Sequence, residues 1–103
     1  MGRRLIAMTL NEIINDIRSH DRDSTIYAGK EWSGSSPAVV EIEPDDGGRP
    51  DTAKDIGAVY FLEISIAQDI FALFMKYPNK HSISILDTVI YYAVNDAYYP
   101  GLP

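Results

Sequence analysis

Cysteine is absent from this chain of 103 residues, which excludes disulfide bonds, thiolate nucleophiles and thiolate metal ligands. Long hydrophobic runs are absent as well, since no apolar stretch approaches the roughly 20 residues of a membrane span. The apolar stretch at residues 5–8 is shorter than the about 7–15 residues of a secretory signal. These absences favour a cytoplasmic protein with no membrane partner, and residues 1–8 are expected to form an N-terminal arm.

Basic residues are few and scattered. The nine lysines and arginines include a single adjacent pair, Arg3 and Arg4. Proteins that contact phosphate groups cluster their basic side chains on one surface. The sequence therefore disfavours nucleic acid as a partner.

Motifs for catalysis and cofactor binding are missing too. The stretch Gly34-Ser35-Ser36 has no lysine in the place that a phosphate-binding loop requires, and Asp45-Asp46-Gly47-Gly48 lacks the spacing of an EF-hand loop. His20 and His81 are the only histidines, and neither lies in a helix with a metal-ligating partner one turn away. The sequence predicts no metal and no cofactor, although a catalytic set assembled in space stays open.

What the chain does have is a strongly acidic middle. Residues 31–69 contain nine acidic and two basic side chains, a formal charge of −7, whereas the whole chain carries −6. Such a field repels phosphate and anionic lipid and attracts basic partners. We therefore expect any partner protein to present a basic surface.

Apolar periodicity and capping pairs predict three helices and three strands. Thr9 with Glu12 forms a capping box for the first helix, and the pairs Ser65/Gln68 and Ser84/Asp87 begin the other two. The last helix is expected to end at Pro100 and Gly101. The predicted strands, rich in β-branched and aromatic residues, span 25–28, 38–43 and 59–64. A single turn of helix is also expected at 51–56, ended by a glycine. The first helix has its apolar stripe at Leu10, Ile13, Ile14 and Ile17.

This order, α-β-β-β-α-α, predicts an α+β fold, a two-layer sandwich of a three-stranded antiparallel meander with helices on one face. Residues 9–103 are expected to form a single domain. The stripes of the second and third helices are Ile70/Leu73/Phe74 and Val89/Ile90/Ala93/Val94. All three helix stripes should converge on one core with Val40, Ile42, Leu62 and Ile64, and Tyr60 shares the strand face of Leu62 and Ile64. The strand at 25–28 is expected at a sheet edge.

Strand alternation predicts a second face of the sheet, expected to be uncovered, with carboxylates around apolar side chains. Its members are Tyr27, Val39, Glu41, Glu43, Phe61 and Glu63. Three interpretations stay open at this point. The face is a solvated sheet surface, a docking surface for a basic partner with the aromatics as anchors, or a set of paired carboxylates for acid–base hydrolysis.

Aromatic residues outside the strands present a similar choice. Trp32 lies in a polar loop, where it either folds back as a lid on the core or serves as a binding anchor. The tyrosines of the last predicted helix are either buried or form a homodimer seam.

The chain resembles small uncharacterised bacterial α+β domains, some of which are immunity-type or accessory proteins. The resemblance is carried by the element order, the loop Trp32, the acidic middle and the motifs Thr-Leu-Asn-Glu-Ile-Ile at 9–14 and Tyr-Phe-Leu-Glu-Ile at 60–64. It implies partner binding rather than catalysis. The expected function is thus a non-enzymatic module that docks a basic partner, with a small acid–base hydrolase or a structural homodimer as alternatives.

Overall fold

A computed structural model describes residues 7–77 and 82–102 of the chain. It confirms the α+β class. The strands are β1 (Met8–Thr9), β2 (Thr25–Ala28), β3 (Pro37–Glu41) and β4 (Val59–Glu63). The helices are α1 (Leu10–Asn15), the 3-10 turn η1 (Ile17–Ser19), α2 (Asp51–Asp55), α3 (Ile64–Phe74) and α4 (Ile85–Asn95).

The four strands form one antiparallel sheet in the order β1-β3-β2-β4. The predicted meander is wrong in this detail, because β2 is central and pairs with both β3 and β4. Ile26 of β2 lies opposite Val40 on one side and opposite Leu62 on the other. The strand at 25–28 is therefore no edge, and the edges are β1, which the sequence did not predict, and β4.

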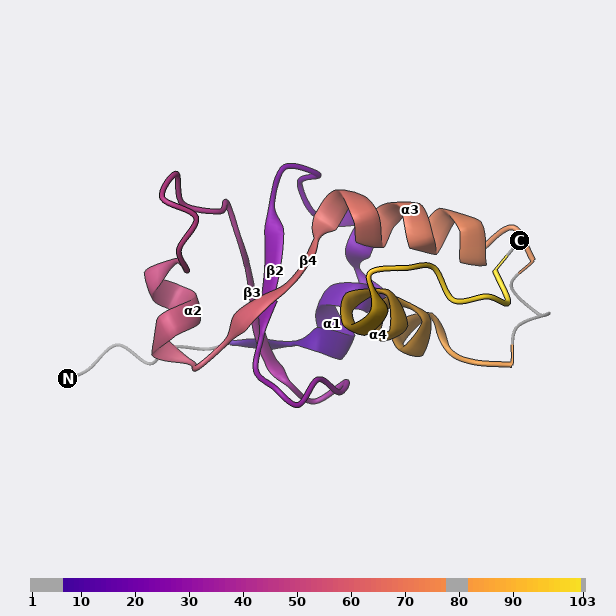
Figure 1. The fold of residues 1–103 in the computed structure, drawn as a ribbon, viewed down its shortest axis with the longest axis horizontal. Coiled ribbons are helices and arrows are strands. Elements are labelled where there is room, and N and C mark those ends of the chain that lie inside the picture. The colour runs from indigo at the N-terminus through magenta and orange to yellow at the C-terminus, as the bar shows by residue number, and fades with distance from the viewer. Residues whose placement is uncertain (1–6, 78–81, 103) are drawn as a thin grey trace.

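Helices α1, α3 and α4 cover one face of this sheet, and α2 lies against the other (Figure 1). The α1 stripe is fully buried, and the Thr9–Glu12 capping box is present with both of its hydrogen bonds. Two members of the predicted core are outside it: Ile42 is 60% exposed because β3 ends at Glu41, and Val94 is 65% exposed. The core on this face includes Leu10, Ile13, Ile14, Ile17, Ile26, Leu62, Ile64, Ile70 and Val89.

A small second core lies under α2. It consists of Tyr27, Ala53 and Ala58, with Val39 and Ile56 packed against it. The expectation of an uncovered sheet face is therefore wrong, because α2 folds back over it. Gly57 follows this helix with φ +68°, a conformation that L side chains rarely adopt, so the glycine ends α2 as predicted.

A β-bulge between β2 and β4 reverses the predicted faces of two aromatic residues. Ile26 lies opposite Leu62, but Tyr27 lies opposite Tyr60, so Phe61 is the extra residue. Phe61 is consequently buried in the main core together with its neighbour Leu62. Tyr60, expected inside, is 45% exposed on the face of Tyr27.

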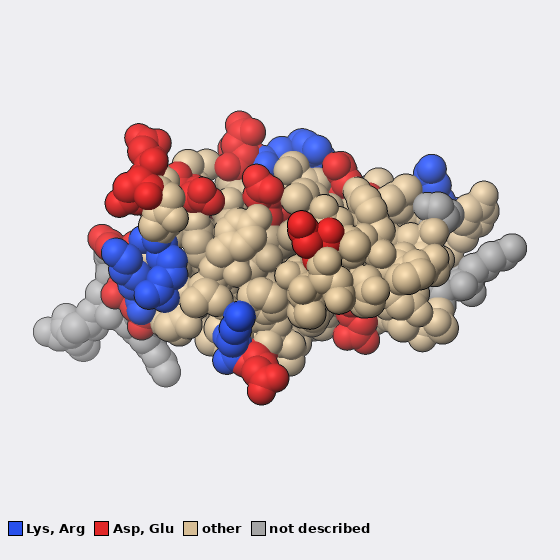
Figure 2. Space-filling model, in the orientation of Figure 1, with Lys and Arg blue, Asp and Glu red and all other residues tan. Residues whose placement is uncertain are grey.

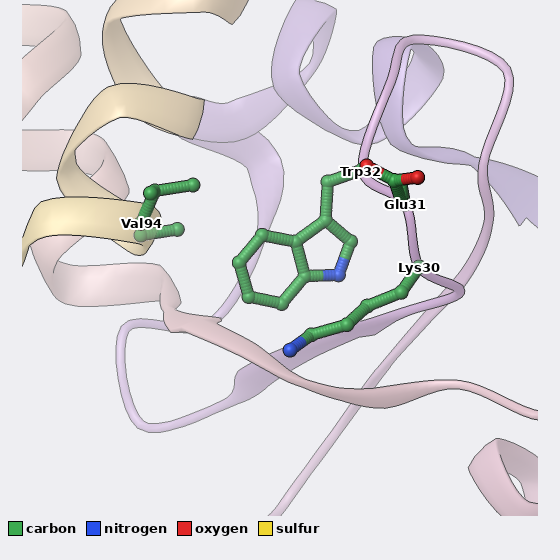
Figure 3. Close-up of a pocket in the computed structure, with 5 residues that line it drawn as sticks. Lys30, Glu31, Trp32 and Val94 are labelled. Carbon is green, nitrogen blue, oxygen red and sulfur yellow. The ribbon is translucent and has the colours of Figure 1, made fainter.

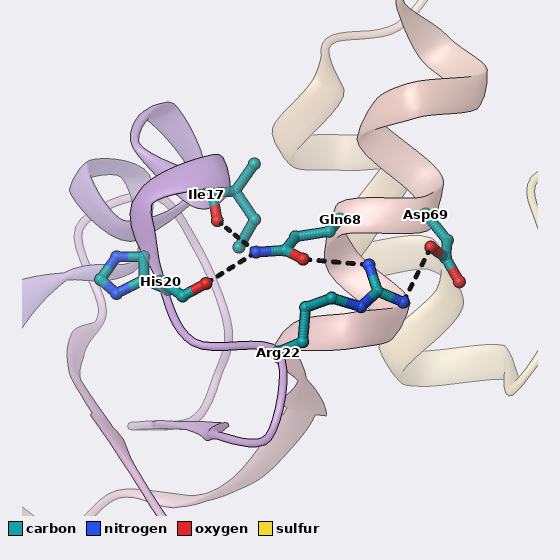
Figure 4. A network of polar contacts seen from close by, with 5 residues as sticks. All are labelled: Ile17, His20, Arg22, Gln68 and Asp69. Carbon is teal, nitrogen blue, oxygen red and sulfur yellow. Dashed lines mark hydrogen bonds and ion pairs between the residues drawn. The ribbon is translucent and has the colours of Figure 1, made fainter.

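Helix α3 begins two residues earlier than the sequence predicts. Its N-cap is Glu63, and Ser65 makes no capping hydrogen bond there. Gln68, the expected partner of Ser65, instead donates its side-chain amide to the carbonyl oxygens of Ile17 at 3.0 Å and His20 at 2.8 Å (Figure 4). It thereby ties α3 to the end of η1.

Helix α4 begins as predicted and ends early. The backbone N–H of Asp87 donates to the hydroxyl of Ser84 at 3.0 Å. The helix then ends at Asn95, because Asp96 adopts the left-handed conformation, with φ 52°. The chain was expected to stay helical to Pro100, but it turns back and brings the tyrosines after the helix against those within it.

Candidate functional site

Exposed tyrosines gather where β4 meets the end of α4. Tyr60 is 45% exposed and Tyr98 is 47% exposed. The ring of Tyr98 lies against that of Tyr92 in an edge-to-face contact with centroids 5.1 Å apart. The bulge in β4 and the early end of α4 produce this arrangement, so it depends on two irregularities of the backbone.

Carboxylates surround these phenol groups. Burial raises the pKa of Tyr60 above the ordinary value, and the negative charges of Glu63 and Glu43 raise it further. Burial and then the charge of Asp96 likewise raise the pKa of Tyr92. The charges of Glu63 and Asp96 act on both rings. We define the tyrosine–carboxylate surface as Tyr60, Tyr92, Tyr98, Glu43, Glu63 and Asp96.

No basic side chain neutralises this surface within residues 7–77 and 82–102. The ion pair that the structure shows among these residues joins Arg22 to Asp69 at 3.3 Å, and neither residue belongs to the tyrosine–carboxylate surface. Figure 2 shows acidic side chains gathered over the loop between β3 and α2, beside a wide uncharged area over the middle of the molecule. A cation approaching this area meets both carboxylates and aromatic ring faces, which attract it together.

An open cavity of about 390 Å³ lies between the loop after β2 and the end of α4. Its lining comprises Lys30, Glu31, Trp32, Ala93 and Val94. Figure 3 shows the indole between Val94 on one side and the side chain of Lys30 on the other.

The indole in this cavity is held in place. Its N–H donates to the carbonyl oxygen of Ala28 at 3.2 Å, and its ring meets Phe61 edge to face with centroids 4.9 Å apart. The Lys30 ammonium lies 5.2 Å from the ring centroid. Trp32 therefore packs on the main core, as the lid interpretation predicts, and part of its ring lines the cavity; its role as a binding anchor stays a prediction.

A third region lies on the outer side of α3. A cavity of about 420 Å³ there includes Arg18, Arg22 and Asp69 in its lining. The Arg18 guanidinium lies 5.4 Å from the centroid of Phe71, and Arg22 is fixed by Gln68 and Asp69 (Figure 4). Asp69 compensates the charge of Arg22 only, so Arg18 leaves the lining with one net positive charge.

The residues predicted to bind a partner do not form one open face. Tyr27 and Phe61 are buried, and Val39 is half-buried beneath α2. Glu41 accepts a hydrogen bond from the Thr52 hydroxyl at 3.0 Å, which connects it to α2. Glu43, Glu63 and Trp32 remain accessible to a partner.

The sequence did not single out Tyr60 or Asp96 for the tyrosine–carboxylate surface, or Val94 for the Trp32 cavity. Strand alternation placed Tyr60 inside, and only the pairing of β4 with β2 reveals the bulge. Helical periodicity placed Val94 in the core. In the structure it lies one residue before the end of α4, which is followed by the left-handed Asp96, and its side chain is exposed. Asp96 carried a local signal, because aspartate tolerates this conformation better than most residues do.

Paired acid–base groups do not converge in the cavities described above. None of these cavities is lined by His20, Glu41, Glu43 or Glu63, and His81 lies outside the described residues. Within the part of the chain that the structure describes, no three His, Asp or Glu side chains cluster closely enough to hold a metal ion. In the same part of the chain, no helix has the length and apolar character needed to cross a membrane.

Comparison with known proteins identifies the family. A model for a domain of unknown function, DUF7716, matches residues 7–100, which include every strand and helix described here. The chain belongs to the DUF7716 family. The comparisons with curated proteins and with solved structures gave no match. The DUF7716 description confirms a small uncharacterised domain family and assigns no activity, so function has to be argued from the surface.

Proposed function

We propose that this chain is a non-enzymatic protein-binding module that docks a basic partner through the tyrosine–carboxylate surface. The observation that carries the proposal is the position of Tyr60. Its ring is exposed on a sheet edge, and the charges of Glu43 and Glu63 act on it. Exposed aromatic rings beside carboxylates are typical of sites that receive lysine or arginine side chains.

The proposed surface differs from the sheet face that the sequence suggested, but it keeps two of its glutamates. Glu43 and Glu63 stay accessible, whereas α2 covers the aromatic centre of that face. Tyr92, Tyr98 and Asp96 from the end of α4 supply the missing aromatic and acidic groups. The long-range attraction comes from the −7 segment at residues 31–69.

We also propose a cytoplasmic and bacterial setting, with an accessory or immunity-type role. In the immunity case the partner is a basic toxin nuclease, and this module covers its phosphate-binding cleft. The acidic middle and the motifs at 9–14 and 60–64 support this choice.

Charge reversal at two different pairs of acidic residues tests whether binding depends on the tyrosine–carboxylate surface or only on the net charge of the chain. The double variant Glu43→Lys/Glu63→Lys and the matched control Asp45→Lys/Asp46→Lys each add four charges, so both change the formal charge from −6 to −2. All four positions are exposed. A fluorescently labelled Arg/Lys peptide is titrated against each variant and the unchanged chain by anisotropy at low and physiological salt.

We expect the Glu43/Glu63 variant to lose about tenfold or more in affinity for the peptide, and the control variant to lose much less. The reason is that only the first pair lies beside the exposed rings. Equal losses in the two variants would contradict the proposal, since they would show that only net charge matters.

A further inference from the structure

Strand β4 is an edge of the sheet, and its outer side is open. Among residues 7–77 and 82–102 no strand pairs with this side, because β2 lies along the inner side only. The open stretch begins at Val59, since the Arg49 guanidinium already donates to the carbonyl oxygen of Ala58 at 2.9 Å. An exposed edge of this kind can add a further strand through backbone hydrogen bonds.

One backbone N–H points out of this edge. Ile64 donates its N–H to the carbonyl oxygen of Ser24 at 2.9 Å, so Ile64 faces β2. The backbone groups of successive residues alternate between the two sides of a strand, so the N–H of Glu63 faces away from β2. Burial and nearby carboxylates raise the pKa of Tyr60, and a hydrogen bond from this N–H opposes the rise. The Tyr60 hydroxyl thus occupies the place where an added strand would offer a carbonyl oxygen.

Aromatic and acidic side chains border the edge on both sides. Tyr27 lies under α2, and Tyr60 lies opposite it in β4, so both point to that face of the sheet. Thr25 shares the face of Tyr27, and its partner Glu63 therefore points the same way. Helix α4 covers the other face, and Asp96 directly follows it (Figure 1). Because the charge of Asp96 also acts on Tyr60, the tyrosine–carboxylate surface extends to both sides of the β4 edge.

Charge complementarity selects the occupant of this edge. An added strand sends successive side chains to opposite sides of the sheet, where they approach Glu63 on one side and Asp96 on the other. Neighbouring cationic residues are therefore both attracted, whereas a second copy of this chain brings its own charge of −6 and is repelled. Edge strand β1 offers no equivalent site, because it has two residues and the N–H of Thr9 already donates to Glu12.

We propose that a basic segment of the partner docks by adding a strand to the outer edge of β4, with neighbouring cationic residues on opposite sides of the sheet. A backbone carbonyl of this segment replaces the Tyr60 hydroxyl at the N–H of Glu63. This inference rests on the proposed function and specifies how the partner binds. The partner contributes an extended segment with adjacent basic residues.

Backbone methylation tests the pairing without changing the charge. The probes are three peptides, each acetylated and amidated, with the sequence Thr-Arg-Lys-Thr-Arg-Lys-Thr. The first is unmodified, and the second carries N-methyl groups on its second, fourth and sixth residues, which block one edge of an extended peptide and leave the other free. The third carries them on its third, fourth and fifth residues, which interrupts both edges and methylates the same three residue types. Affinity for the full chain is measured by titration calorimetry, and amide hydrogen exchange by NMR.

We expect the second peptide to bind within about threefold of the unmodified one, and the third to bind roughly tenfold or more weakly, because it cannot form the backbone hydrogen bonds. Binding of the first two peptides should slow amide hydrogen exchange at Glu63, since its N–H becomes covered. Exchange at Leu62, which lies opposite Ile26 of β2, should change far less and serves as the internal control.

Other results overturn the inference in distinguishable ways. If the two methylated peptides bind equally, side chains alone hold the segment, so strand addition is refuted while the docking of a basic partner stands. If exchange at Glu63 is unchanged at saturating peptide, the segment does not lie on this edge. If light scattering shows a dimer in which the Glu63 amide is already protected, a second copy occupies the edge. If the unmodified peptide does not bind at millimolar concentration, the inference and the proposed function both fail.

Discussion

Tyr27 and Tyr60 lie edge to face with ring centroids 6.4 Å apart, yet one ring is buried and the other is 45% exposed. They occupy opposed positions in the pairing of β2 with β4. Helix α2 covers Tyr27, and nothing described covers the outer side of Tyr60. The buried ring thus supports the exposed one, which connects the small second core to the proposed docking surface.

Replacing Tyr27 by phenylalanine should leave the free energy of unfolding unchanged or raise it by up to about 1 kcal/mol. The phenol oxygen of Tyr27 is buried and has no hydrogen-bond partner among the described residues, so its loss costs nothing. Tyr27→Ala should instead lower the free energy of unfolding by about 3–5 kcal/mol, because it empties the core under α2. Urea unfolding measures both values. A clear destabilisation by Tyr27→Phe would mean that the hydroxyl has a partner.

The pH dependence of stability should also change in this variant. Burial, and then the charge of Glu43, raise the pKa of Tyr27 above the ordinary tyrosine value of 10.0. A raised tyrosine pKa means that the unfolded chain releases the proton first as pH rises. Ionisation of Tyr27 therefore leaves the free energy of unfolding unaffected below about pH 10 and lowers it above that pH. Tyr27→Phe should weaken the fall in stability above pH 10, measured by urea unfolding in a pH series; an unaltered fall would contradict this origin.

Helix caps provide a stability test in which one predicted cap serves as the control. Thr9→Ala and Ser84→Ala should each lower the free energy of unfolding by about 1 kcal/mol, because each removes an acceptor for a backbone N–H at a helix start. Ser65→Ala should change it by less than about 0.5 kcal/mol, since α3 begins before this residue. Thermal or urea unfolding measures all three. An equal cost for Ser65→Ala would place the start of α3 where the sequence predicted it.

Local signals in the sequence explain why some elements were predicted well. The capping box of Thr9 and Glu12 and the stripe behind it lie within one short segment, and they determine α1 with no help from other parts of the chain. The single turn of α2 is likewise ended by Gly57, which lies directly after it. Both predictions depend on residues close in sequence.

Features that depend on distant pairing could not be predicted in the same way. The Ser65/Gln68 motif is locally complete, but Gln68 instead bonds carbonyl groups 51 and 48 residues away. The alternation of β4 is broken by a bulge that exists only through its pairing with β2. Tyr60 reaches the candidate surface for that reason, so the sequence showed Glu43 and Glu63 of the site but neither Asp96 nor the central aromatic ring.

Removing the Gln68 side chain should be costly, although the residue is polar and only half-buried. Its amide satisfies the carbonyl oxygens of Ile17 and His20, so Gln68→Ala should lower the free energy of unfolding by about 1–3 kcal/mol. Arg22→Ala should cost less than about 1 kcal/mol, because its ion pair with Asp69 is 55% exposed on both sides. Urea unfolding gives both values, and amide hydrogen exchange near residues 17–20 should accelerate only in the Gln68 variant. The reverse order of costs would contradict this account of the joint between η1 and α3.

Truncating apolar residues should separate the core of this protein from its candidate binding site. Ile14 is 1% exposed, so Ile14→Ala should lower the free energy of unfolding by about 2–5 kcal/mol. Val94→Ala and Ile42→Ala should each change it by less than about 0.5 kcal/mol, because both side chains are already mostly in water. A large loss of stability in Val94→Ala would show that this valine belongs to the core.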